Sequence, residues 1–202
     1  SKENAEPNLE MFIHVTKDGF GAMGHVDICY KGRIISFGNY DTNSERLFGA
    51  MGDGVLFSAD REKYIEFCKR ENHKTLLGYG LALSPEQLAA VDKEIAKLMS
   101  LTVPWDPPKT VKPKRPGIDK EEPMYAYKLK QEADGRLYKF TSSKFKTYFV
   151  MSTNCVLLAD TIVGAAGTDI LSVRGFISPG TYQDYLDKEF ERPHSLVVTK
   201  RV

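Results

Sequence analysis

The apolar stretch that follows Asn154 is the feature that most restricts how this 202-residue chain can fold. It reads "NCVLLADTIVGAAG" and closes at Gly167. A helix that is apolar on nearly every side has to be covered by other elements. We therefore predict a buried helix that carries Cys155 on its first turn.

Cys155 in that position has two interpretations. The exposed N–H groups and the positive end of the helix dipole favour a thiolate at the start of a helix, which is how a cysteine becomes a nucleophile. Free cysteine is also a common small residue of protein cores. The remaining sequence has to decide between a nucleophile and a core residue.

The composition excludes several classes of protein. The chain is long enough for one well-cored domain, which we expect to span residues 1–202. Its 28 basic and 27 acidic residues leave a net charge of +1, which gives no electrostatic basis for binding nucleic acid. Three cysteines without metal-type spacing indicate neither a disulfide framework nor a zinc site, and no cofactor is expected. No apolar run approaches the roughly 20 residues of a membrane span.

The pattern along the chain predicts an α+β fold. We expect strands near residues 11–15, 25–30, 34–40, 52–58 and 75–83, and helices at 60–70 and 85–98. The second helix has an N-cap at Ser84 and Gln87 at the capping-box position. Strands at 124–131 and 135–142 would form a hairpin around the Asp134-Gly135 step. Residues 146–152 would be extended, followed by the Cys155 helix, a short helix within 177–186 and a strand within 194–202.

A proline-rich and lysine-rich segment interrupts this pattern at residues 104–123. It holds six of the ten prolines, so we expect a surface excursion without regular structure. Either a solvated linker or a loop that edges a binding cleft fits this composition.

A cysteine nucleophile needs a base, and histidine is the side chain best suited to proton transfer near neutral pH. His14 lies in an early strand, His73 in a polar turn and His194 after a proline. His25 follows a glycine-rich segment at 17–24 and opens a strand, where an imidazole can lie at the edge of a cleft. A purely structural histidine at a strand end is the alternative.

A third residue would orient the imidazole. A three-residue connection in "KGR" would set Asn39 opposite His25, whereas a two-residue connection would set Gly38 there. Asn39 is the first choice and Asp41 the second. Asp27 shares the face of His25 but lies about 7 Å further along the same strand, which ranks it third.

Three segments together resemble a known family. They are "GHVDICYKGRIISFGNYD", then "STNCVLLADTIVGAAG", then "SPGTYQDYL". In this order, with histidine before cysteine, they are similar to the circularly permuted branch of the NlpC-type, papain-like cysteine peptidases. The resemblance implies an antiparallel sheet packed against a central helix with the cysteine at its N-terminus. The middle of the chain is not matched.

The resemblance also implies roles for individual residues. Cys155 would be the nucleophile, His25 the base, and Asn39 or Asp41 the orienting residue. Many members have His, Glu or Gln in the third role, so the chain departs from the family pattern there. The oxyanion would be held by the Cys155 N–H with Asn154 or Ser152 as a neighbouring donor.

The resemblance suggests hydrolysis of a peptide or isopeptide bond, with peptidoglycan stem peptides as the substrate. The same thioester chemistry on a lipid or other acyl donor, in an acyltransferase or thioesterase, is the alternative. A binding module with a buried cysteine is the non-enzymatic alternative. The chain begins at Ser1 in a polar segment, which suggests a removed leader and a secreted or cell-envelope location, although the sequence does not fix the location. Whether an inhibitor or immunity protein binds the site is left open.

Overall fold

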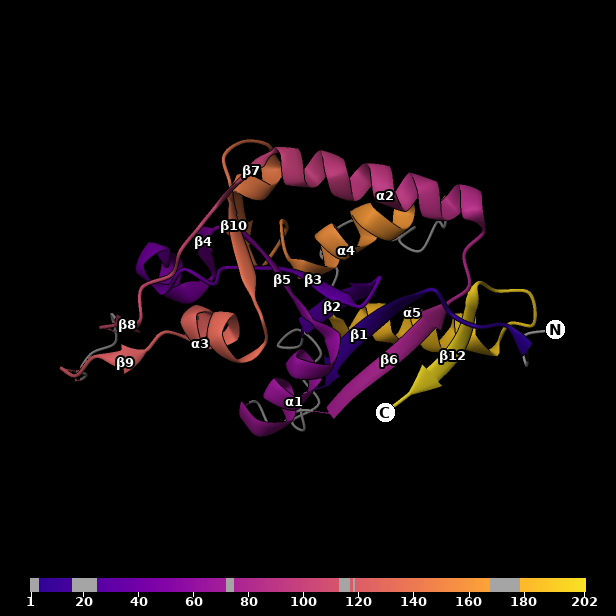
Figure 1. Cartoon of the computed structure of the whole chain (residues 1–202), viewed down its shortest axis with the longest axis horizontal. Coiled ribbons are helices and arrows are strands. Elements are labelled where there is room, and N and C mark those ends of the chain that lie inside the picture. The colour runs from indigo at the N-terminus through magenta and orange to yellow at the C-terminus, as the bar shows by residue number, and fades with distance from the viewer. Residues whose placement is uncertain (1–3, 16–24, 72–74, 113–116, 118, 168–178) are drawn as a thin grey trace.

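The computed structural model describes residues 4–15, 25–71, 75–112, 117, 119–167 and 179–202. Within these ranges the chain is α+β, with helices around an eight-stranded sheet of order β12-β6-β1-β2-β3-β5-β10-β7 (Figure 1). All neighbouring strands in this sheet are antiparallel. The predicted α+β class with an antiparallel sheet is therefore confirmed.

The bounds of the elements are as follows. The strands of the large sheet are β1 (Leu9–Val15), β2 (His25–Tyr30), β3 (Arg33–Gly38), β5 (Val55–Asp60), β6 (Thr75–Leu81), β7 (Thr102–Pro104), β10 (Arg136–Phe140) and β12 (Val197–Arg201). Two small sheets pair β4 (Met51–Asp53) with β11 (Thr147–Phe149), and β8 (Thr110–Val111) with β9 (Glu122–Pro123). The helices are α1 (Arg61–Glu71), α2 (Pro85–Ser100), α3 (Tyr125–Glu132), α4 (Cys155–Gly164) and α5 (Pro179–Glu191).

The sheet separates two hydrophobic cores, because successive residues of a strand point to opposite faces. In β1, Met11 and Ile13 enter the first core, whereas Phe12 enters the second. Buried residues of α2, α4 and α5 complete the first core, and those of α1 and α3 complete the second. Helices therefore cover both faces, with α2 and α4 on the opposite side of the sheet from α1 and α3 (Figure 1).

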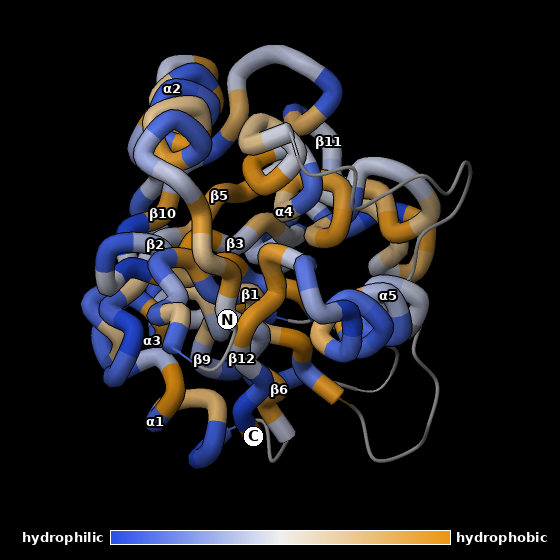
Figure 2. The backbone as a smooth tube through the Cα atoms, turned by 90° about the vertical axis from the view of Figure 1, so that its right-hand side faces the viewer, coloured by the Kyte–Doolittle hydropathy of each residue, from blue (hydrophilic) through white to orange (hydrophobic). Residues whose placement is uncertain are grey.

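Helix α4 is the buried helix that the sequence predicts. Six of its side chains are buried, and it packs against β2 and β3. In Figure 2 it is a mainly apolar segment between the sheet and α2, whose own turns alternate between polar and apolar residues. The capping box of α2 is also present, since Ser84 and Gln87 bond to each other's backbone N–H groups.

The hairpin predicted for residues 124–142 is wrong. Residues 125–132 form α3, and the Asp134-Gly135 step ends this helix instead of turning between two strands. The physical reason is the spacing of Ala126 and Leu129, which are both fully buried against the second core at a helical interval. The Asp134 φ of 50° is the left-handed conformation that commonly follows a helix.

The excursion at 104–123 contains more regular structure than its prolines suggest. Pro104 closes β7, which pairs with β10 at the edge of the sheet, where a strand proline is tolerated. Further on, β8 pairs with β9 and brings Thr110 opposite Pro123. The predicted absence of regular structure is therefore wrong at these short strands.

Some sequence predictions fall outside the described residues: the glycine-rich segment 17–24, His73, and the first two residues of 177–186. Of the rest of that segment, residues 179–186 lie in α5, as predicted. None of the helices in the described ranges has the length and the apolar character needed to cross a bilayer.

Candidate active site

The turn between β2 and β3 determines which residues face His25. Lys31 and Gly32 have φ angles of 52° and 76°, the left-handed pair of a two-residue type I′ turn. Tyr30 therefore pairs with Arg33, and Ile28 with Ile35. The same register, continued, sets Gly38 opposite His25. The three-residue connection that would have placed Asn39 there is not formed.

Asp27 is the residue that contacts His25. His25 Nε2 lies 2.6 Å from Asp27 Oδ1, and the carboxylate side chain is fully buried while that of His25 is 22 % exposed. No aligned hydrogen bond reaches Oδ1 from the described residues, so this contact is an ion pair. The buried Asp27 carboxylate therefore stabilises the protonated, charged form of His25.

The other carboxylate oxygen of Asp27 is held by two further side chains. His14 Nε2 lies 2.5 Å from Oδ2, and the Tyr64 hydroxyl donates to the same oxygen at 2.7 Å. Both side chains are buried, His14 on β1 and Tyr64 on α1. Asp27 is therefore fixed from two elements besides its own strand.

Two hydroxyl groups lie beside the same nitrogen of the His25 ring that faces Asp27. Ser36 Oγ is 2.6 Å from His25 Nε2, and the Tyr40 hydroxyl is 3.0 Å from Ser36 Oγ and 3.3 Å from the same nitrogen. Burial raises the pKa of Tyr40 well above its ordinary value, and the charge of Asp27 adds to this effect. Tyr40 therefore stays a neutral hydroxyl beside the imidazole.

The electrostatics favour a charged His25. Burial alone would lower its pKa, but the Asp27 carboxylate and, after it, the Cys155 thiolate outweigh burial and raise the pKa of His25 to about 10. Burial likewise opposes the charge of Asp27, yet His25 and His14 hold the pKa of this carboxyl well below its ordinary value. The pair is thus an imidazolium and a carboxylate near neutral pH, and Cys155 lies close enough to the imidazole to add to this effect.

Cys155 begins α4 and is 4 % exposed. Asn154 caps the helix: its side-chain oxygen accepts from the Leu157 N–H at 3.1 Å, and its amide donates to the Val150 carbonyl at 3.1 Å. The N–H groups of Cys155 and Val156 have no acceptor among the described residues, as expected for the first turn of a helix. They are therefore able to hold a negative oxygen next to the sulfur.

The predicted site residues are only partly brought together. Cys155 and His25 are neighbours, whereas Asn39 donates to the Gly49 carbonyl at 3.0 Å and Asp41 pairs with Lys139 at 2.6 Å. Within the described chain no hydrogen bond or ion pair joins Asn39 or Asp41 to His25. Asn154 serves as the cap of α4, and Ser152 is exposed on the turn before it.

Asp27, ranked third from sequence, is the one of the three candidates that contacts His25 within the described chain. The spacing of about 7 Å separates backbone positions along the strand. The side chains of His25 and Asp27 project from the same face of β2 and meet at 2.6 Å. A usable signal was present: Asp27 is an acidic residue in the middle of the apolar strand "HVDICY", and a buried acid needs partners. The roles of His14 and Tyr64 left no comparable signal, because they come from distant segments.

The nitrogen and oxygen donors of His14, His25 and Asp27 lie within 4.8 Å of one another, which is the type of cluster that can hold a metal ion. The histidine-to-carboxylate separations of 2.5 and 2.6 Å are nevertheless shorter than the distance of about 3.3 Å between two ligands of a tetrahedral zinc ion. As placed, these groups bind one another directly.

The other two cysteines are buried in the second core. Burial raises the pKa of Cys29 to about 12, and the nearby Glu10 carboxylate adds to this effect. Cys68 is fully buried on α1. Neither cysteine lies at the start of a helix beside a histidine. Cys155 differs from both because it begins α4 next to His25.

The ion pair predicts a pH-dependent stability. Because the pKa of His25 in the folded chain, about 10, exceeds its ordinary 6.5, its stabilising contribution is complete below pH 6.5 and is lost as the pH rises towards 10. The contribution of Asp27 is present above 3.8 and is lost as the pH falls below it. We expect His25→Gln to lower the free energy of unfolding most between these limits, at about pH 4 to 6.5, and progressively less up to pH 10.

Urea unfolding of both proteins at pH 5.5, 8 and 10 measures this difference. His194→Gln is the matched control, because His194 is an exposed histidine, and it should leave the free energy of unfolding unchanged. A His25→Gln effect that stays constant or grows with pH would contradict the ion pair.

Comparison of the chain with protein-family models, with curated proteins and with solved structures gave no match.

Proposed function

We propose that this chain is a cysteine hydrolase of the permuted papain-like type that cleaves amide bonds through a thioester. The observation that carries the proposal is the arrangement of three groups. Cys155 begins α4, and the His25 imidazolium lies beside it. The buried Asp27 carboxylate is 2.6 Å from His25. A nucleophile, a base and an orienting acid in contact are the parts that acyl transfer needs.

Acylation would begin with the Cys155 thiolate. Its sulfur attacks the carbonyl carbon of the amide, and the oxygen becomes an oxyanion held by the N–H groups of Cys155 and Val156. His25 then donates its proton to the amide nitrogen as the C–N bond breaks. The products are a free amine and a thioester on Cys155, with His25 neutral.

Hydrolysis of the thioester would use the same groups in reverse. Neutral His25 takes a proton from water, and the resulting hydroxide attacks the thioester carbon. The C–S bond breaks, a carboxylic acid leaves, and the thiolate and imidazolium are restored. Asp27 stabilises the charged imidazole in both half-reactions and is not itself protonated.

The substrate class follows from the resemblance to cell-wall hydrolases, which points to peptide or isopeptide bonds of peptidoglycan stem peptides. The test is to incubate the protein with purified stem peptides and to follow new amino groups by mass spectrometry. We expect time-dependent release of an amine and, after rapid acid quenching, a peptide-derived mass increase on Cys155. Absence of both across a panel of stem peptides would refute this substrate.

An acyl donor is the second candidate, because an exposed apolar loop lies next to the segment before Cys155. Leu47 and Phe48 are 62 % and 111 % exposed, and both have left-handed φ angles. The loop is joined to that segment by the Val150 N–H, which donates to the Ala50 carbonyl at 3.0 Å. Apolar side chains held in solvent suit an acyl chain. A lipid-derived adduct on Cys155 in the same quench experiment would favour this candidate over amide hydrolysis.

A further inference from the structure

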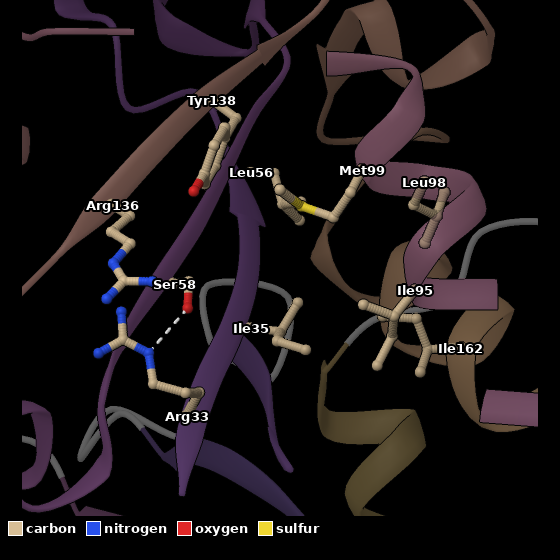
Figure 3. Close-up of a pocket in the computed structure, with 10 residues that line it drawn as sticks. All are labelled: Arg33, Ile35, Leu56, Ser58, Ile95, Leu98, Met99, Arg136, Tyr138 and Ile162. Carbon is tan, nitrogen blue, oxygen red and sulfur yellow. Dashed lines mark hydrogen bonds between the residues drawn. The ribbon is translucent and has the colours of Figure 1, made fainter. Parts of the chain in front are cut away.

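A cavity lies at the other end of the β2–β3 hairpin from His25. It has a volume of about 210 Å³ and is enclosed by β3, β5 and β10 on one side and by α2 and α4 on the other (Figure 3). Its lining is Arg33, Ile35, Leu56, Ser58, Ile95, Leu98, Met99, Arg136, Tyr138 and Ile162. None of these residues takes part in the site around Cys155.

The register of the sheet brings two arginines to one end of this cavity. Ile35 pairs with Ser58, and Ser58 pairs with Arg136 on the next strand. Arg33 is two residues before Ile35, so strand alternation places Arg33, Ser58 and Arg136 on the same face. Figure 3 shows the two guanidinium groups next to each other at the polar end, while Ile95 and Met99 line the opposite, apolar wall.

The two arginines at this end of the cavity differ in their partners. Arg33 is fixed by Ser58 Oγ at 3.1 Å and by the Asp134 side chain and carbonyl at 3.1 and 3.0 Å. Arg136 is exposed and has no hydrogen bond or ion pair with any described residue. Asp60, which pairs with Arg33 in the register, has Oδ2 bonded to the Lys63 N–H at the start of α1. Arg33 is thus paired with the Asp134 carboxylate, whereas Arg136 has no carboxylate partner among the described residues.

We propose that this cavity binds a small amphipathic carboxylate, with its anionic group between Arg33 and Arg136 and its apolar part against Ile95 and Met99. Guanidinium groups bind carboxylates through paired, charge-assisted hydrogen bonds, and a bound carboxylate would give Arg136 a partner. The apolar wall adds selectivity for a hydrophobic tail. Since a cavity of about 150 Å³ holds benzene, 210 Å³ accommodates a six-carbon chain.

Hexanoate is the probe for this proposal, and isothermal titration calorimetry with NMR shift mapping is the measurement. We expect saturable binding with shift changes at Met99 and Arg136. Acetate, which lacks the tail, and hexylammonium, which has the opposite charge, should each bind at least tenfold more weakly. Inorganic phosphate tests the alternative of a plain anion site and should also bind more weakly than hexanoate.

Arg136→Gln should weaken hexanoate binding about tenfold or more, the loss expected for a charged hydrogen-bonding partner. Because Arg136 is exposed, this variant should fold like the parent, and a circular dichroism spectrum checks that it does. Arg201→Gln is the matched control at an exposed arginine of β12 and should bind like the parent. Cys155→Ala should also bind like the parent, so this result is independent of the proposed hydrolase.

Three results would overturn the proposal. They are hexanoate binding no tighter than acetate, phosphate binding as tight as hexanoate, and an unchanged affinity in folded Arg136→Gln.

Discussion

Cys155→Ala is expected to abolish amine release from stem peptides, with a fall of up to about 10⁶-fold, the scale seen when an enzyme loses its nucleophile. The substitution removes the sulfur that forms the thioester, and no other described thiol lies at the start of a helix beside an imidazole. Alanine suits the first turn of a helix, so the fold should persist. The measurement is the initial rate of amine release, together with a circular dichroism spectrum and a melting temperature.

Cys29→Ala is the matched control for this experiment, because it makes the same change at another buried cysteine. The pKa of Cys29, about 12, keeps that thiol protonated at neutral pH, so its removal should leave the rate close to that of the parent. Equal rates in Cys155→Ala and the parent would refute the hydrolase mechanism. A loss of activity only in Cys29→Ala would move the nucleophile to the second core.

Asp27→Asn is expected to lower the rate by about 10³- to 10⁴-fold, as the corresponding change does in a serine triad. Asparagine has nearly the same shape but no charge, so burial would no longer be outweighed and the pKa of His25 would fall. A neutral His25 neither stabilises the thiolate nor protonates the leaving amine. The rate of amine release and an NMR titration of the His25 ring measure the two effects.

Asp41→Asn distinguishes the structure from the sequence-based choice of orienting residue. Asp41 carries the same charge, but it pairs with Lys139 and contacts the N-terminus of a short helix at 42–44 instead of His25. We expect the rate to stay close to that of the parent, because Asp41 contacts Lys139 and not His25 among the described residues. A large loss in Asp41→Asn with an active Asp27→Asn would restore Asp41 as the orienting residue.

Local patterns in the sequence were sufficient for much of the fold. The apolar run after Asn154 predicted a buried α4, and Ser84 with Gln87 predicted the start of α2, because both signals act within one element. Alternation in β2 likewise put Asp27 on the same face as His25, and the two side chains do make contact. At α3 the structure depends on tertiary contacts, and there the Asp134-Gly135 turn signal led to the wrong prediction of a hairpin.

The candidate site required information that the local sequence does not contain. Whether Gly38 or Asn39 lies opposite His25 depends on one residue in the turn at Lys31-Gly32. The partners of Asp27 come from β1 and α1, and only the folded sheet brings His14 and Tyr64 to one carboxylate. The sequence nevertheless pointed to Cys155 and His25, the two residues of the proposed reaction, because a cysteine at a helix start and a histidine at a strand start are recognisable from their own neighbours.

The outer strands of the large sheet, β7 and β12, influence whether copies of this chain aggregate at high concentration. An open strand edge is a template for pairing with another molecule, and proteins protect such edges with proline and with charge. Here β7 ends at Pro104, followed by Pro107 and Pro108, and β12 ends with Lys200 and Arg201. Both margins therefore resist the addition of a further strand, and we expect concentrated protein to be protected from aggregation by edge-to-edge sheet growth.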